Sequence, residues 1–99
     1  MAQTEFSIAI EGSSILVKLR GELDMQTAPE LDRCLKAIQS DTVVDCSGLD
    51  FIDSSGIRAF VEAHQAFAAR GNHLTLRDLP ALVQRVFEIT GLNDVLEIE

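Results

Sequence analysis

One short segment combines residue types that could carry out chemistry at the start of a helix. Asp53, Ser54, Ser55 and Gly56 place a carboxylate, two hydroxyl groups and a glycine directly before an apolar-periodic segment. A small hydroxyl residue in that position is typical of a helix start, where free backbone N–H groups favour an anion. The segment fits two interpretations, a helix cap with an Asx-type turn or a serine presented for chemistry, and its spacing alone is compatible with both.

A second acidic segment, Gly21-Glu22-Leu23-Asp24, follows an earlier strand pattern. Open α/β sheets place functional groups outside the carboxyl ends of their strands. If the strands before the two segments run parallel, both segments emerge at the same edge of the sheet. Asp24, Asp53 and Glu22 would then surround the serines with negative charge.

Other sets of catalytic or ligand residues are not found in the sequence. The two histidines, His64 and His73, are expected in structural or surface roles, and no Cys or His pair has metal-ligand spacing. Gly-rich phosphate-binding loops are also absent. Cys34 and Cys46 are expected to pack as small apolar groups, with a redox-sensitive pair as the alternative. We therefore expect a protein that is not an enzyme and needs no cofactor or metal.

Composition narrows the possible partners. The 99 residues suggest a single domain over 1–99, and the 16 acidic against 8 basic side chains give a formal net charge of −8. Such acidity argues against nucleic-acid binding and against anionic membrane surfaces. It suits a protein partner that presents basic residues, and it fits equally an acidic surface that serves solubility alone. With no signal pattern and no apolar run long enough to span a bilayer, we expect a cytoplasmic protein.

Strand and helix patterns alternate along the chain. Residues 6–11 and 15–20 predict an antiparallel hairpin across a turn at Gly12-Ser13, and Thr27 to Glu30 matches a capping box for the first helix. Further strands are predicted at 42–46 and 73–77, with a short one near 95–98, and helices at about 55–70 and from 78–80 to Gly91. The expected buried face of the last helix comprises Leu82, Val83, Val86, Phe87 and Ile89.

This order predicts an α/β fold in which strand–helix–strand units cross over right-handed onto a partly parallel sheet. We expect a mixed sheet of four to five strands with an N-terminal antiparallel hairpin and about three helices packed on it. The first turn of the middle helix then follows a strand directly. We expect Ser55 to cap that helix and Ser54 to lie on its loop side.

Taken together, three segments resemble the STAS domain family of bacterial anti-sigma factor antagonists, the sporulation and general-stress anti-anti-sigma factors. They occur in the family's order over almost the whole chain: Gly21-Glu22-Leu23-Asp24, Phe51-Ile52-Asp53-Ser54-Ser55-Gly56-Ile57 and Leu82-Val83-Gln84-Arg85-Val86-Phe87-Glu88-Ile89-Thr90-Gly91-Leu92.

The resemblance implies partner switching. An unphosphorylated antagonist binds an anti-sigma factor, itself a serine kinase that uses ATP, and so frees the sigma factor. Phosphorylation ends the complex, and a PP2C-type phosphatase restores it. The family's acceptor position corresponds to Ser54, with Ser55 as the fallback. The expected partner-binding residues are Glu22, Asp24, Asp53, Ser54, Ser55, Gly56, Ile57 and Arg58.

Arg58 departs from the family pattern, in which a small residue usually stands at this position. It could select the partner or pair with the phosphate, and the sequence leaves both open. A different function is also open: a STAS scaffold or regulatory subunit, as in a stressosome or a lipid-transport ABC system, would hold its partner constitutively through the same face.

Overall fold

The computed structural model describes residues 4–11 and 14–99, so the predicted turn at Gly12-Ser13 lies outside the described residues. Within these described residues, five strands and three α-helices alternate, with one short 3-10 helix near the end. In order they are β1 (Thr4–Glu11), β2 (Ser14–Leu23), α1 (Ala28–Lys36), β3 (Thr42–Ile52), α2 (Ser54–Ala69), β4 (Leu74–Arg77), α3 (Ala81–Thr90), η1 (Leu92–Asp94) and β5 (Glu97–Ile98).

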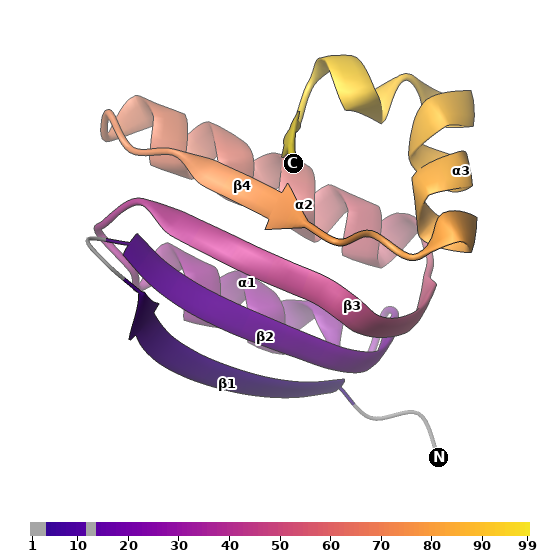
Figure 1. The fold of residues 1–99 in the computed structure, drawn as a ribbon, viewed down its shortest axis with the longest axis horizontal. Helices are drawn as coiled ribbons and strands as arrows, with labels where there is room; N and C mark the ends of the chain where they lie inside the picture. Colours follow the sequence, from indigo (N-terminus) through magenta and orange to yellow (C-terminus); the bar gives the residue numbers. More distant parts are fainter. Residues whose placement is uncertain (1–3, 12–13) are drawn as a thin grey trace.

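The five strands form one sheet in the order β1-β2-β3-β4-β5. β1 runs antiparallel to β2, whereas β2, β3, β4 and β5 pair in parallel. In Figure 1, α1 and α2 cover one face of this sheet, and α3 lies beyond the edge where β3 and β4 end. The α/β architecture with three helices agrees with the fold expected from the sequence.

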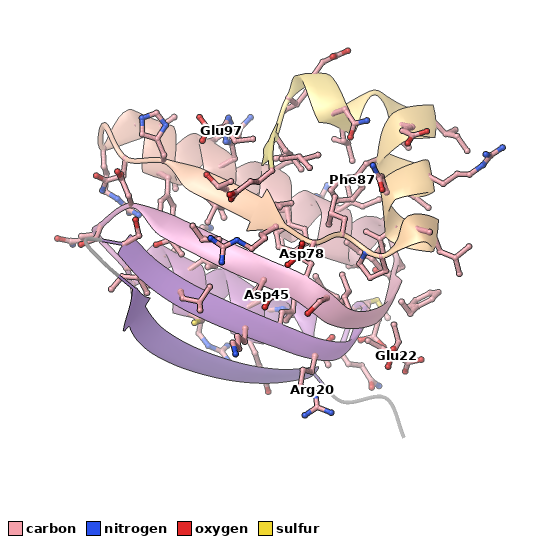
Figure 2. All side chains as sticks on the ribbon, in the orientation of Figure 1. Arg20, Glu22, Asp45, Asp78, Phe87 and Glu97 are labelled. Atoms are coloured by element: carbon pink, nitrogen blue, oxygen red, sulfur yellow. The ribbon has the colours of Figure 1, made fainter. Side chains whose placement is uncertain are left out.

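The core lies between the sheet and the two helices behind it. Alternate residues of β2 and β3 are buried there, because a strand directs successive side chains to opposite faces. The largest side chains without exposed surface are Phe60, Phe67 and Phe87. On the opposite, open face of the sheet, Figure 2 shows charged side chains, among them Asp45 and Arg20.

Two strands continue further than their sequence patterns indicate. β3 was expected to end at Cys46 but extends to Ile52, and β2 extends to Leu23. The register between β2 and β3 shifts twice along this extension, so the alternation is interrupted. A Cβ atom at Gly48 would lie 2.8 Å from Cγ of Arg20, so glycine permits the close approach of the strands. Because of these register shifts, the residues after Cys46 continue β3 although their sequence resembles a turn.

The last helix has a narrower buried face than expected. Val83 and Phe87 are buried, but Leu82 is 78% exposed and Ile89 is 74% exposed, so their prediction as core residues is wrong. α3 packs beyond the end of the sheet rather than across it, so only one narrow stripe of the helix meets the core. Apolar periodicity alone does not reveal how wide that stripe is.

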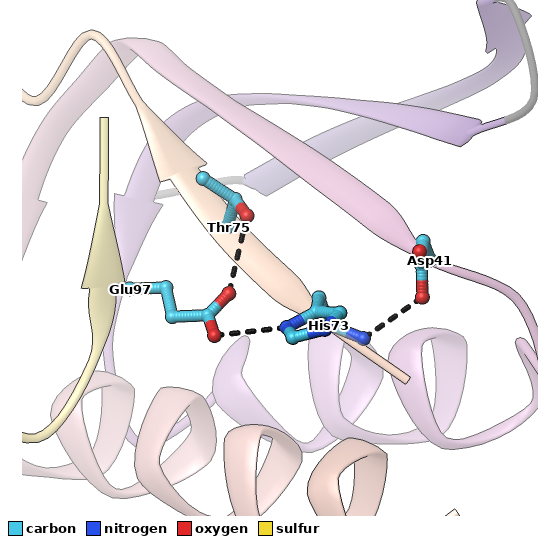
Figure 3. Close-up of polar contacts among 4 residues, drawn as sticks. All are labelled: Asp41, His73, Thr75 and Glu97. Atoms are coloured by element: carbon cyan, nitrogen blue, oxygen red, sulfur yellow. Dashed lines mark hydrogen bonds and ion pairs between the residues drawn. The ribbon is translucent and has the colours of Figure 1, made fainter. Parts of the chain in front are cut away.

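The edge strand β5 is held to β4 by a short ladder and a cluster of surface side chains. The ladder pairs Thr75 with Glu97 and Leu76 with Ile98. Nδ1 of His73 lies 3.0 Å from Oε1 of Glu97, and the backbone N–H of His73 donates to Asp41 Oδ1 at 2.9 Å (Figure 3). The polar cluster thus connects the β3 start, β4 and β5.

Candidate functional site

Two loops meet at the carboxyl edge of the sheet because β2 and β3 run parallel and end in register. Leu23 pairs with Ile52, and the next residue of each chain segment is an aspartate, Asp24 or Asp53. The backbone N–H of Asp53 donates to the carbonyl oxygen of Leu23 at 3.1 Å, which joins the two strand ends. The predicted meeting of the two acidic segments is therefore confirmed.

Asp53 is the N-cap of α2. Its Oδ1 accepts hydrogen bonds from the backbone N–H groups of Ser55, at 2.8 Å, and Gly56, at 3.2 Å. Ser54 and Ser55 are the first and second helical residues, so the prediction that Ser55 caps the helix is wrong. A carboxylate accepts two of the otherwise unpaired N–H groups more strongly than a neutral hydroxyl does. Neither serine hydroxyl is therefore needed to cap the helix.

The two serines differ in exposure. Ser54 is exposed, whereas Ser55 is half-buried. Ile57, in the same helical turn, is partly buried against the core, and its N–H donates to the carbonyl oxygen of Asp53 at 3.0 Å. The first turn of α2 is thus fixed by its backbone and by an apolar neighbour while the side chain of Ser54 is accessible.

Gly56 brings the start of α2 into direct contact with both strand ends. A Cβ atom there would lie 2.7 Å from Cγ1 of Ile52, 2.8 Å from Cγ of Leu23 and 2.9 Å from the carbonyl oxygen of Leu23. Real Cβ atoms do not approach neighbours so closely, so the helix could sit here only with a glycine. Gly56 therefore shapes the site through packing and needs no positive φ angle.

The loop before α1 is organised by Asp24 and Thr27. Oδ1 of Asp24 accepts from the backbone N–H groups of Gln26, at 2.9 Å, and Thr27, at 3.1 Å. The Thr27 hydroxyl accepts from the N–H of Asp24 and lies 2.9 Å from the carbonyl oxygen of Glu22. Thr27 therefore makes no side-chain cap for α1, and the predicted capping box with Glu30 is wrong.

These contacts keep Asp24 ionised. Desolvation opposes ionisation, but the hydrogen bonds from Thr27 and Gln26 outweigh it and hold the pKa of the Asp24 carboxyl below its ordinary value. Glu22 is half-buried on β2 and pairs with Phe51 of β3. Figure 2 shows Glu22 at the end of the sheet where β2 and β3 finish. Two carboxylates of the β2–α1 segment, with Asp53, make this edge acidic.

A groove of about 280 Å³ between α1 and α2 opens beside the serines. Its lining mixes apolar and charged side chains: Met25, Ala28, Pro29, Asp32, Ser55, Arg58, Ala59 and Glu62. Met25 is 74% exposed, and on the β3 side Phe51 is 48% exposed. We did not anticipate Met25 or the α1 residues from the sequence, because the groove requires the packing of α1 against α2.

Arg58 lies in this groove, one turn from the serines. Its side chain is exposed, and the described part of the chain offers it no hydrogen bond or ion pair. The predicted site residues lie at the end of β2 and in the loop after it, at the N-cap of α2, or on the first turns of α2. What this surface can do chemically is present an accessible hydroxyl next to carboxylates and a groove lined by apolar and charged side chains.

Other candidate chemistry lies away from this edge. Cys34 and Cys46 are free thiols. Burial raises the pKa of the Cys34 thiol and raises that of Cys46 to about 12, so both thiols are protonated near neutral pH. Among the side chains that the structure describes, those of residues 14–99, no cluster of three or more His, Cys, Asp or Glu could hold a metal ion. In the same residues, no helix is both long and apolar enough to cross a bilayer.

Sequence relatives agree with the resemblance. An anti-sigma-B factor antagonist of Listeria monocytogenes is 36% identical over 80% of this chain and 73% of its own. One of Staphylococcus aureus is 33% identical, over 83% of this chain and 80% of its own.

Solved structures agree at the level of the fold. SpoIIAA, an anti-sigma factor antagonist, in its unphosphorylated form covers 96% of this chain and 88% of its own with a TM-score of 0.78 at 19% identity. The phosphorylated form of the same Bacillus cell fate determinant covers 96% and 91%, with a TM-score of 0.72 at 18% identity. The family described as "Mlab, STAS domain" matches residues 6–97. With this match and its sequence relatives, the chain belongs to the STAS domain family.

Proposed function

We propose that this protein is an anti-sigma factor antagonist, a regulatory protein without catalytic activity of its own, and that it acts in the cytoplasm. The observation that carries the proposal is the accessible Ser54 on the first turn of α2, beside the acidic loop of Asp24. The names of the relatives that are 33% and 36% identical support the same role. Its partner is an anti-sigma factor that is also a serine kinase.

Ser54 is the acceptor in this proposal, and Ser55 is the fallback. The kinase moves the γ-phosphoryl group of ATP to Oγ of Ser54: the new O–P bond forms as the bond to ADP breaks, and the hydroxyl proton leaves. A PP2C-type phosphatase returns the serine by hydrolysis. Because Asp53 rather than a serine caps α2, phosphorylation leaves the helix cap intact.

Charge explains how the complex is broken. A phosphoserine adds about −1.5 to −2 charges at neutral pH. It adds to the carboxylates of Asp53, Asp24 and Glu22 at the same edge of the sheet, and a partner surface that fits the unmodified site must desolvate the added charge as well. A loss of about 3–4 kcal/mol of binding free energy weakens affinity by about a few hundredfold. The switch therefore needs no change of fold.

The proposal is tested by incubating the protein with anti-sigma kinases and ATP and mapping the modified residue by mass spectrometry. We expect phosphate on Ser54 and none after Ser54→Ala. Ser47→Ala is the matched control, because Ser47 is also exposed but lies on β3. A kinase that binds the protein and modifies neither Ser54 nor Ser55 would show the switch to be wrong.

Ser54→Asp tests the charge argument separately from the chemistry. We expect its circular dichroism to match the wild type, while its affinity for the anti-sigma factor falls. Ser54→Ala should bind and stay bound when ATP is present. Wild-type affinity in Ser54→Asp would contradict the charge argument.

The alternative of a STAS scaffold or regulatory subunit makes the opposite prediction. In a stressosome or a lipid-transport ABC system, the same edge would hold its partner whether or not ATP is added. Complex lifetime measured with and without ATP separates the two functions.

A further inference from the structure

Arg58 is placed to meet a phosphate on the preceding helical turn. In α2 it follows Ser54 by four residues and Ser55 by three, spacings at which side chains are neighbours on a helix, with Cβ atoms about 5–6 Å apart. Ser55 and Arg58 line the same groove. The guanidinium has no hydrogen bond or ion pair with any described residue, so it is available to a new anion.

Neither of the two carboxylates that line the same groove forms an ion pair with Arg58. Asp32 and Glu62 line the same groove, but Asp32 is bridged by Lys36 at 3.1 Å. Glu62 follows Arg58 by four residues, the order in which an i,i+4 ion pair is less favourable, because the helix dipole favours the acid nearer the N-terminus. A phosphate on Ser54 would precede Arg58 by four residues, which is the favourable order.

The backbone offers a phosphate little at this helix start. Oδ1 of Asp53 already accepts the N–H groups of Ser55 and Gly56, the donors that an anion would otherwise take. With the cap intact, a phosphate on Ser54 finds its counter-charge in a side chain rather than in these N–H groups. Of the side chains lining the groove, Arg58 is the one that carries a positive charge.

Resting on the proposed function, we propose that Arg58 is the internal counter-ion of phosphorylated Ser54. Its planar guanidinium donates two parallel N–H···O hydrogen bonds to phosphate oxygens, a geometry that arginine forms and lysine does not. The pairing holds the phosphate at the mouth of the α1–α2 groove. Phosphorylation then blocks Met25 and the groove as well as adding charge, and part of the phosphate's charge is balanced within the protein itself.

The test titrates the phosphate directly. Phosphoserine is incorporated at position 54 of the whole chain during synthesis, and its ³¹P resonance is followed at low ionic strength through its second pKa, about 6 in phosphoserine. Removing a paired cation makes the dianion less stable. We expect Arg58→Ala to raise this phosphate pKa by roughly 0.3 to 0.7, and Arg58→Lys to raise it by less.

Arg70→Ala is the matched control, because it removes the same charge from the other end of α2, about 24 Å along the helix. It should leave the phosphate pKa unchanged. Equal titration of the wild type and Arg58→Ala would overturn the proposal, and so would an equal shift in Arg70→Ala. A merely structural role of Arg58 would not move this titration. Because no kinase is used, failure to find a kinase for Ser54 leaves this result unaffected.

Discussion

The helices α2 and α3 both follow a strand of the parallel part of the sheet, yet they are attached in different ways. α2 begins at the carboxylate cap of Asp53, and Gly56 brings its backbone against two strand ends. α3 begins at Pro80, which makes no side-chain cap, and buries only Val83 and Phe87. A side-chain cap and close backbone packing hold the first turn of α2, whereas two buried side chains hold α3.

This difference matters for the proposed switch. A helix start that is capped and packed through its backbone keeps its position when a serine on it gains a charge. The same modification on α3 would act on a helix without a side-chain cap. An acceptor on α2 therefore changes the surface of the protein with little effect on its fold, as partner switching requires.

The largest effect is expected at the larger of the two side chains that α3 buries. Phe87→Ala removes a ring without exposed surface and should lower the free energy of unfolding by about 3–5 kcal/mol. Ile89→Ala on the exposed side of the same helix should change it by less than about 0.5 kcal/mol. Urea unfolding of both variants measures this, and similar losses would contradict the narrow buried stripe.

The next effect compares two glycines. Gly56→Ala should cost about 3 kcal/mol, because its Cβ atom meets backbone as well as side chains at under 3.0 Å. Gly91, which ends α3, has a φ angle of 76° and open space around it, so Gly91→Ala should cost only about 1 kcal/mol of left-handed strain. Thermal unfolding compares them, and a smaller loss at position 56 than at 91 would show that α2 is not tightly packed.

A smaller effect identifies the cap of α2. Asp53→Ala should lower the free energy of unfolding by about 1 kcal/mol, the usual cost of losing an N-cap side chain. Ser55→Ala should have little effect, because the Ser55 side chain makes no cap hydrogen bond. Chemical denaturation of the two variants checks this, and the reverse order of losses would restore Ser55 as the cap.

The smallest effect on stability is expected from the ion pair between His73 and Glu97 of β5, on the α3 side of the molecule. The hydrogen bond and charge of Glu97, and then the charge of Asp41, raise the pKa of His73. Stability from this pair is therefore complete below the ordinary histidine pKa, about 6.5, and is lost as pH rises through the higher value in the folded protein. Thermal unfolding of wild type and Glu97→Gln across that range should diverge only on the acidic side.

A pH profile of Glu97→Gln identical to that of the wild type would show that the exposed pair contributes nothing. We expect a small difference, since both side chains are largely exposed to solvent. With so small a contribution from the ion pair, β5 depends mainly on its short ladder to β4 and on the burial of Leu96.

Much of the fold could be predicted from local patterns. Alternating apolar residues predict most of the strands, and Gly91, the predicted end of the last helix, has a positive φ angle. The placement of Asp24 beside Asp53 followed from parallel strand order alone. Prediction failed where one pattern has two physical meanings, as in α3, where Leu82 and Ile89 have core-like spacing but face solvent.

For the segment Asp53-Ser54-Ser55-Gly56, the sequence by itself determined that a capped helix start with accessible hydroxyls lies at a sheet edge. Which residue caps could not be read from it, since three adjacent residues are all able to cap a helix. Only the tertiary structure decided this. Pairing with β2 extends β3 to Ile52, and the close contact of Gly56 fixes where the helix begins, so the capping position falls on Asp53 and leaves Ser54 free.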